Sequence, residues 1–143
     1  MAEQGLRILG AHTDSPCLKV KPSPDATKHD YQQASLEVYG GVLLSPWFDR
    51  DLALAGKVSF VGSDDQLQST LVDTKRPVAI IPSLAIHLDR TANQGKAINP
   101  QEDMSPILWQ GKAFENMRDW LSHWLTGQGL TAKEILDWDL SFY

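Results

Sequence analysis

The chain has 143 residues, 42% of them hydrophobic and 22% charged, which is the composition of one ordinary globular domain. Its net charge of -5 excludes a basic surface for a nucleic-acid backbone, and no apolar run reaches the ~20 residues of a membrane span. One cysteine and a start without signal-peptide features lead us to expect a cytoplasmic protein that binds neither nucleic acid nor membrane.

The first three fifths of the chain predict short strands separated by turns. Residues 22–30 are rich in proline and polar side chains, and they predict a loop. A hairpin is predicted where two alternating runs flank the turn residues Gly62 to Asp65. The predicted strands are residues 6–10, 17–21, 31–41, 57–62, 66–73 and 76–82. This pattern is typical of a small barrel or a sandwich.

The remaining chain changes to a helical period. A helix is predicted over residues 113–126, with an apolar stripe formed by Phe114, Met117, Leu121 and Trp124. The capping-box pattern of residues 131–134 predicts a second short helix. Residues 137–143 predict a strand with no polar tail, from which we expect the natural chain to continue.

One further stretch carries little regular pattern. Residues 82–90 predict one or two helical turns, because Leu84 and Leu88 are four residues apart. Residues 91–106 predict a polar loop, long enough to be a functional or mobile excursion.

His12 and Asp14 are candidates for half of a metal site. Residues two apart in an extended segment point the same way, and a carboxylate can fix the tautomer of a metal-binding imidazole. An aspartate before Ser-Pro is also an ordinary turn residue, so this pattern alone leaves both readings open. A catalytic zinc needs three protein ligands, and the sequence offers no His-Glu-x-x-His motif, no cysteine cluster and no Glu-Glu pair.

The other reactive side chains admit structural explanations. His29 lies in a polar stretch, His123 falls at the edge of the predicted helix stripe, and Cys17 begins an apolar run. The cluster of residues 49–51, Asp-Arg-Asp, is typical of a charged turn between strands. His87 has apolar neighbours and suits either a satisfied surface histidine or a pocket rim.

Three stretches taken together resemble the aspartyl aminopeptidase family of dinuclear zinc metallopeptidases. They are "GAHTDSPCLKVKP", "VYGGVLLSPWFDRDLALAGKV" and "RPVAIIPSLAIHL". The resemblance runs from about Arg7 to Tyr143. It implies an α/β catalytic domain with two metal ions and an inserted small β-barrel domain with added helices. That insertion covers the substrate pocket and drives assembly into a dodecamer.

The resemblance divides the chain and assigns three residues. Residues 1–21 match an edge of the catalytic domain, and residues 22–143 match the inserted lid and oligomerisation domain. His12 matches a metal-ligand histidine, and Asp14 matches the aspartate of the catalytic machinery that orients it. His87 matches a histidine that enters a neighbouring subunit's substrate pocket.

The expectation is therefore a β-rich α+β fold, with a small closed barrel-like lid, in part of a zinc aminopeptidase. The substrates would be peptides with an acidic first residue. Two Zn²⁺ ions would serve each complete site, with Co²⁺ or Mn²⁺ as alternatives. The family's other metal ligands follow the matched region, so we expect this chain alone to be inactive and to hold no zinc tightly. The alternative is a non-catalytic β-rich module for protein interaction or oligomerisation.

Overall fold

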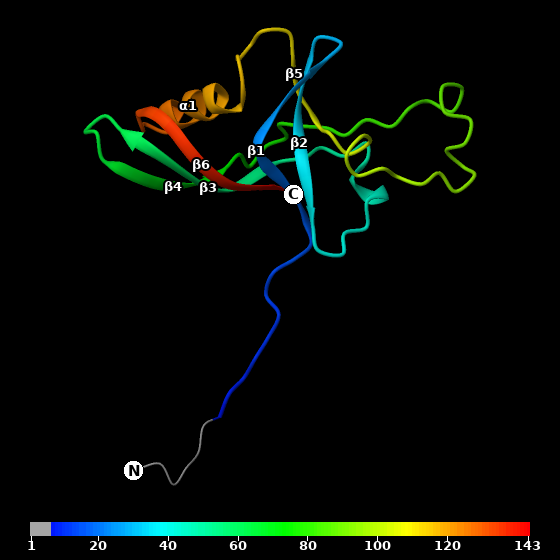
Figure 1. Cartoon of the computed structure of the whole chain (residues 1–143), viewed down its shortest axis with the longest axis horizontal. Helices are drawn as coiled ribbons and strands as arrows, with labels where there is room; N and C mark the ends of the chain where they lie inside the picture. The colour runs from blue at the N-terminus through cyan, green and yellow to red at the C-terminus, as the bar shows by residue number, and fades with distance from the viewer. Residues whose placement is uncertain (1–6) are drawn as a thin grey trace.

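The computed structural model describes residues 7–143, which form one six-stranded antiparallel sheet with a helix on it (Figure 1). The strand order is β4-β3-β6-β1-β2-β5, and the predicted β-rich α+β class is confirmed. In chain order the elements are β1 (Cys17–Lys28), β2 (Tyr31–Tyr39), the 3-10 helix η1 (Ser45–Trp47), β3 (Leu54–Gly62), β4 (Leu67–Asp73), β5 (Ile107–Gln110), α1 (Met117–Gly127) and β6 (Ala132–Phe142).

The expected closed barrel is wrong. β4 and β5 are the two ends of the strand order, and no ladder joins them within residues 7–143. Residues 79–81, predicted to lie in a strand over 76–82, make only isolated bridges to Phe48, Leu52 and Ile107. Pro77 and Pro82 flank this segment, and a proline has no N–H to extend a ladder.

The loop predicted at residues 22–30 is also wrong, because β1 continues to Lys28. Val20 pairs with Leu36 and Asp25 pairs with Ala34, so five steps along β1 oppose two steps along β2. This large bulge takes up the two prolines without ending the strand. Asp25 then accepts a hydrogen bond from the Met117 backbone N–H at 2.7 Å, which ties the bulge to the start of α1.

The second short helix predicted at residues 131–134 is wrong, whereas the strand predicted at 137–143 lies largely within β6. Ile135, Trp138, Leu140 and Phe142 of this strand are buried. β6 pairs with β3 from Leu54↔Phe142 to Gly62↔Ala132, and this tertiary pairing overrides the local capping signal.

The hairpin of β3 and β4 and the helix α1 are confirmed. The helix begins later than predicted, at Met117, where the side chain of Asn116 accepts a hydrogen bond from the Asp119 N–H at 2.9 Å. Met117, Leu121 and Leu125 form its buried face.

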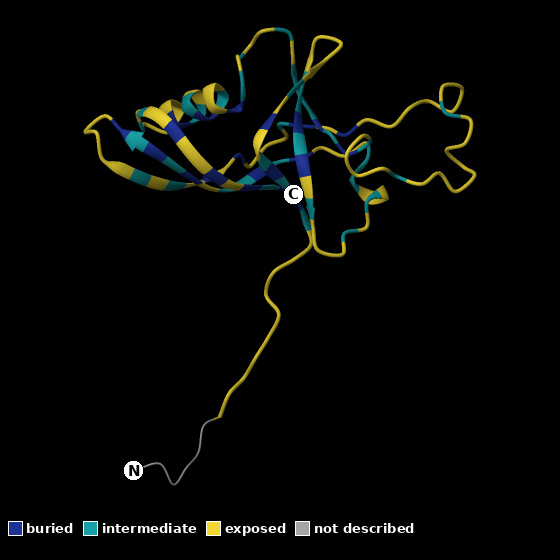
Figure 2. Cartoon of the chain, viewed as in Figure 1, coloured by how far each residue is buried: buried dark blue, intermediate teal, exposed yellow. Residues whose placement is uncertain are grey.

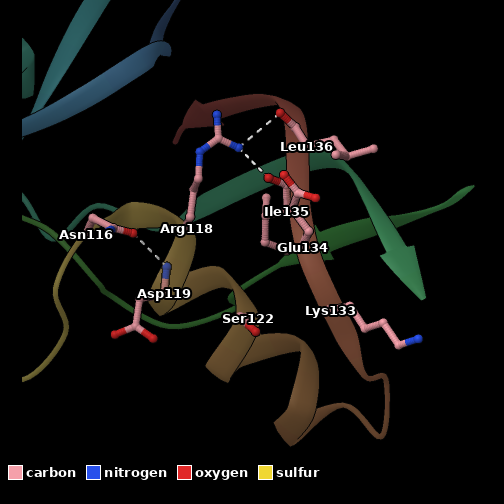
Figure 3. A pocket seen from close by; sticks show the side chains of 8 residues that line it. All are labelled: Asn116, Arg118, Asp119, Ser122, Lys133, Glu134, Ile135 and Leu136. Carbon is pink, nitrogen blue, oxygen red and sulfur yellow. Dashed lines mark hydrogen bonds between the residues drawn. The ribbon is translucent and has the colours of Figure 1, made fainter. Parts of the chain in front are cut away.

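An arginine of α1 braces a bulge in β6. Ser59 pairs with Asp137 and Phe60 pairs with Ile135, so one extra residue of β6 lies between them. Arg118 donates from Nη1 to the carbonyls of Ile135 and Leu136, at 2.5 and 3.0 Å (Figure 3). A shallow cavity of about 530 Å³ lies beside this contact. Arg118 lines the cavity, and its hydrogen bonds hold α1 against β6.

The segment before β1 does not form the predicted strand. Arg7 to Gly10 have no strand pairing, and Leu6 lies outside the described residues. Residues 7–16 are exposed and extend away from the sheet (Figure 2). Across residues 7–143, no helix has the length and apolar character to cross a membrane.

Candidate functional site

The structure brings His12 and Asp14 together, as the sequence predicts for side chains two residues apart. His12 Nδ1 lies 2.5 Å from Asp14 Oδ1, and both side chains are more than half exposed, at 74% and 58%. A bond at Nδ1 leaves Nε2 as the nitrogen whose lone pair is free. The imidazole is therefore held in the orientation that a carboxylate gives to a metal-binding histidine.

A third residue, Tyr39, completes this group, although no sequence motif indicates it. The Tyr39 hydroxyl donates to Asp14 Oδ2 at 2.9 Å. This hydrogen bond and the negative charge of Asp14 raise the pKa of Tyr39 above its ordinary value. The two residues are 25 positions apart, and only the register that places Tyr39 opposite Cys17 brings the phenol to Asp14.

This coupling predicts a change in the alkaline titration of one tyrosine. We expect Asp14→Asn to lower the pKa of Tyr39 toward the ordinary phenol value, because the substitution removes the negative charge that opposes phenolate formation. NMR of tyrosine labelled at Cζ, recorded from pH 8 to about 12, measures it. Tyr143 is the control, since Asp73 raises its pKa instead. An unchanged Tyr39 titration would contradict the coupling.

These residues supply one ligand of a zinc site and do not complete one. Zinc takes three protein ligands in catalytic sites and four in structural ones, whereas His12 offers one nitrogen. Within residues 7–143, no three or more His, Cys, Asp or Glu side chains gather where they could hold a metal ion. His29 is exposed in the turn after β1, and His123 is exposed on α1 with its ring 5.3 Å from that of Phe114.

His87 lies in a different part of the molecule, in the long excursion between β4 and β5. Residues 86–88 form a single turn where one or two turns were predicted, closed by the Leu88 and Asp89 N–H groups on the Ala85 carbonyl. The side chain of His87 is exposed, and so are those of Leu84 and Leu88, at 59% and 68%. In the described part of the chain no hydrogen bond or ion pair joins His87 to His12 or Asp14.

Charged groups anchor this excursion at its base. The Asp49 carboxylate accepts from the Ser83 N–H at 2.8 Å and from the Ser83 hydroxyl, and both bonds lower the pKa of Asp49. Asp89 and Lys96 form an ion pair at 2.8 Å beside a cavity of about 470 Å³. The hydrogen bonds between Asp49 and Ser83 agree with the structural role expected for residues 49–51.

Comparison with known proteins finds one family. Residues 1–142 match the model described as aminopeptidase I zinc metalloprotease (M18). The chain is 53% identical over 142 residues to the probable M18 family aminopeptidase 2 of Pseudomonas syringae pv. tomato, a match that covers 97% of this chain and 33% of that protein. The chain thus spans about a third of the curated relatives it matches.

Solved structures agree with this result. A chain in the cryo-EM structure of the Ape4 and Nbr1 complex is similar with a TM-score of 0.80 and 32% identity, over 92% of this chain and 28% of that one. The S. cerevisiae mApe1 dodecamer is similar with a TM-score of 0.68 and 26% identity, over 92% of this chain and 30% of that one.

Proposed function

Because the chain belongs to the M18 family of aminopeptidase I zinc metalloproteases, we propose that it is one part of a metal-dependent aminopeptidase. The whole enzyme would remove an acidic first residue from peptides. The observation that carries this proposal is the contact between His12 Nδ1 and Asp14, which leaves a single imidazole nitrogen ready to bind a metal. The lone cysteine favours the cytoplasm as its compartment.

His12 would supply one metal ligand and Asp14 would orient it, while the rest of the protein would supply the other ligands. Residues 1–21 would belong to the edge of the catalytic domain, and residues 22–143 would form the inserted lid. β1 runs from Cys17 to Lys28 and would join the two parts without a flexible linker.

His87 would act in the substrate pocket of a neighbouring subunit in a dodecamer. Its exposed position on an anchored excursion with exposed leucines supports this role, since such a segment can enter a partner without unfolding. An imidazole can donate a hydrogen bond to an acidic substrate side chain.

The proposed function is tested by zinc-dependent hydrolysis of aspartyl and glutamyl arylamides with the full-length protein. We expect chelation to abolish hydrolysis and added zinc to restore it, with leucyl arylamide a poor substrate. Failure to cleave any aminoacyl arylamide, together with stable self-association, would support the alternative of a non-catalytic interaction module.

His87→Ala in the full-length protein should lower kcat/KM for aspartyl arylamide by about 10- to 100-fold, the range for one lost charge-assisted hydrogen bond of about 1.5–3 kcal/mol. Zinc content should be unchanged, because the histidine binds no metal in this proposal. His123→Ala, at another exposed histidine, is the control.

A mixing experiment tests whether His87 acts across an interface. Subunits with His87→Ala retain their own His12, and subunits with His12→Ala retain His87. Reassembling the two impaired variants together should raise the activity above the sum of their separate activities. No recovery, with mixed assemblies verified by mass, would exclude action in a neighbouring pocket.

A further inference from the structure

We propose that Tyr39 is a positioning residue that fixes the Asp14 carboxylate and, through it, the His12 imidazole for metal binding. The inference rests on the proposed metal-ligand role of His12. It adds a group from the sheet to a site that otherwise lies on an extended segment.

The segment that carries His12 has one polar attachment to the sheet. Within residues 7–143, the Tyr39 hydroxyl is the only group that donates to or accepts from residues 7–16 from outside that segment. The segment is otherwise exposed, and its strand pairing begins at Cys17. The bond from Tyr39 to Asp14 is therefore the polar contact, within residues 7–143, that ties the exposed segment before β1 to the sheet.

Tyr39 itself is well placed to act as an anchor. It is the last residue of β2, directly opposite Cys17 of β1. Lys19 Nζ lies 5.4 Å from the centroid of its ring and pairs with Asp139 of β6 at 2.7 Å. The following residue, Gly40, lies against Pro16, since an added Cβ would be 3.5 Å from the Pro16 Cβ. The Tyr39 ring thus lies beside Lys19 of β1, and Asp139 of β6 holds that lysine in place.

The two oxygens of Asp14 have separate partners. Oδ1 lies against His12 Nδ1, and Oδ2 accepts from the Tyr39 hydroxyl. When both carboxylate oxygens are bound, the Asp14 side chain cannot rotate about its Cβ–Cγ bond without losing one of the two contacts. The imidazole that depends on it therefore keeps one tautomer and one direction for Nε2, which reduces the entropy lost when a metal binds.

The test compares Tyr39→Phe with Tyr31→Phe. Tyr39→Phe removes only the hydroxyl, and Tyr31 is a matched control because it lies on the same strand and is partly exposed, at 38%. In the full-length protein we expect Tyr39→Phe to weaken zinc affinity by about 10- to 100-fold, measured by competition with a chromophoric chelator. The kcat should recover in excess zinc with KM nearly unchanged, which general destabilisation would not produce.

A second readout does not depend on activity. In the 143-residue chain labelled with ¹⁵N-histidine, NMR should find the Nδ1–H tautomer of His12 dominant, and Tyr39→Phe should shift it toward the mixture of a free imidazole. If both readouts for Tyr39→Phe equal those for Tyr31→Phe, the inference is overturned. If instead His12→Ala retains zinc, the proposed function fails, so the two failures are distinguishable.

Discussion

Replacing His12 with alanine is expected to abolish aminopeptidase activity in the full-length protein. The substitution removes the nitrogen that we propose as a metal ligand. Losing a residue that only hydrogen-bonds to a metal ligand already costs about 10- to 100-fold in metal affinity. We therefore expect zinc affinity to fall by more than about 100-fold. A bound metal supplies several kcal/mol of transition-state stabilisation, so the rate should fall on the order of 10³-fold or more.

Metal analysis of the purified variant and its rate on aspartyl arylamide measure this effect. His29→Asn is the matched control, because His29 is exposed in a turn with a φ of 50°, a conformation that asparagine tolerates. This control should keep full zinc content and rate. Wild-type zinc content and activity in His12→Ala would remove the ligand assignment.

Gly56→Ala is expected to have the largest effect on stability. Gly56 pairs with Val72 of β4 on one side and Leu140 of β6 on the other, with a φ of 151°. An added Cβ would lie 1.9 Å from the carbonyl oxygen of Asp139, and no backbone atom can rotate away. Overpacking and backbone strain each cost about 1–3 kcal/mol, so together they should reduce the free energy of unfolding by about 2–6 kcal/mol.

Urea denaturation of the 143-residue chain measures this loss. Gly127→Ala is the control, since its added Cβ would meet no atom within 4 Å beyond its chain neighbours and its own helix backbone, and it ends α1. There the change should be neutral or stabilising, by up to about 1 kcal/mol. Equal midpoints for the two variants would mean that the sheet adjusts at Gly56 without cost.

Local patterns predicted the parts of the fold that local chemistry determines. The β3–β4 hairpin follows from alternation around a turn, and α1 follows from an apolar stripe, although its start at the Asn116 N-cap was not predicted. The errors occur where distant partners decide. The prolines of residues 22–30 signal a loop, yet a bulge accommodates them, and the capping box at residue 131 is overridden by pairing with β3.

The candidate site divides in the same way. His12 and Asp14 are two residues apart, so their contact could be expected from the sequence. Tyr39 could not be found by spacing, because the register of β1 with β2 brings it to Asp14. The anchoring of the His87 excursion likewise depends on a hydrogen bond between Asp49 and Ser83, which are 34 positions apart in the sequence.

The position of β6 governs the order in which this sheet can assemble. Among the strands of residues 7–143, β6 is the one that lies between β3 and β1 and pairs with both, so it joins the β3–β4 ladder to the β1–β2–β5 ladder. During synthesis, the β1–β2 and β3–β4 hairpins emerge from the ribosome before residues 132–142, so the strand edges that pair with β6 remain unpaired until then. Closing the gap brings Leu18 against Phe142, across most of the chain, and such distant contacts slow folding. During that interval the unpaired edges are exposed to association with other chains.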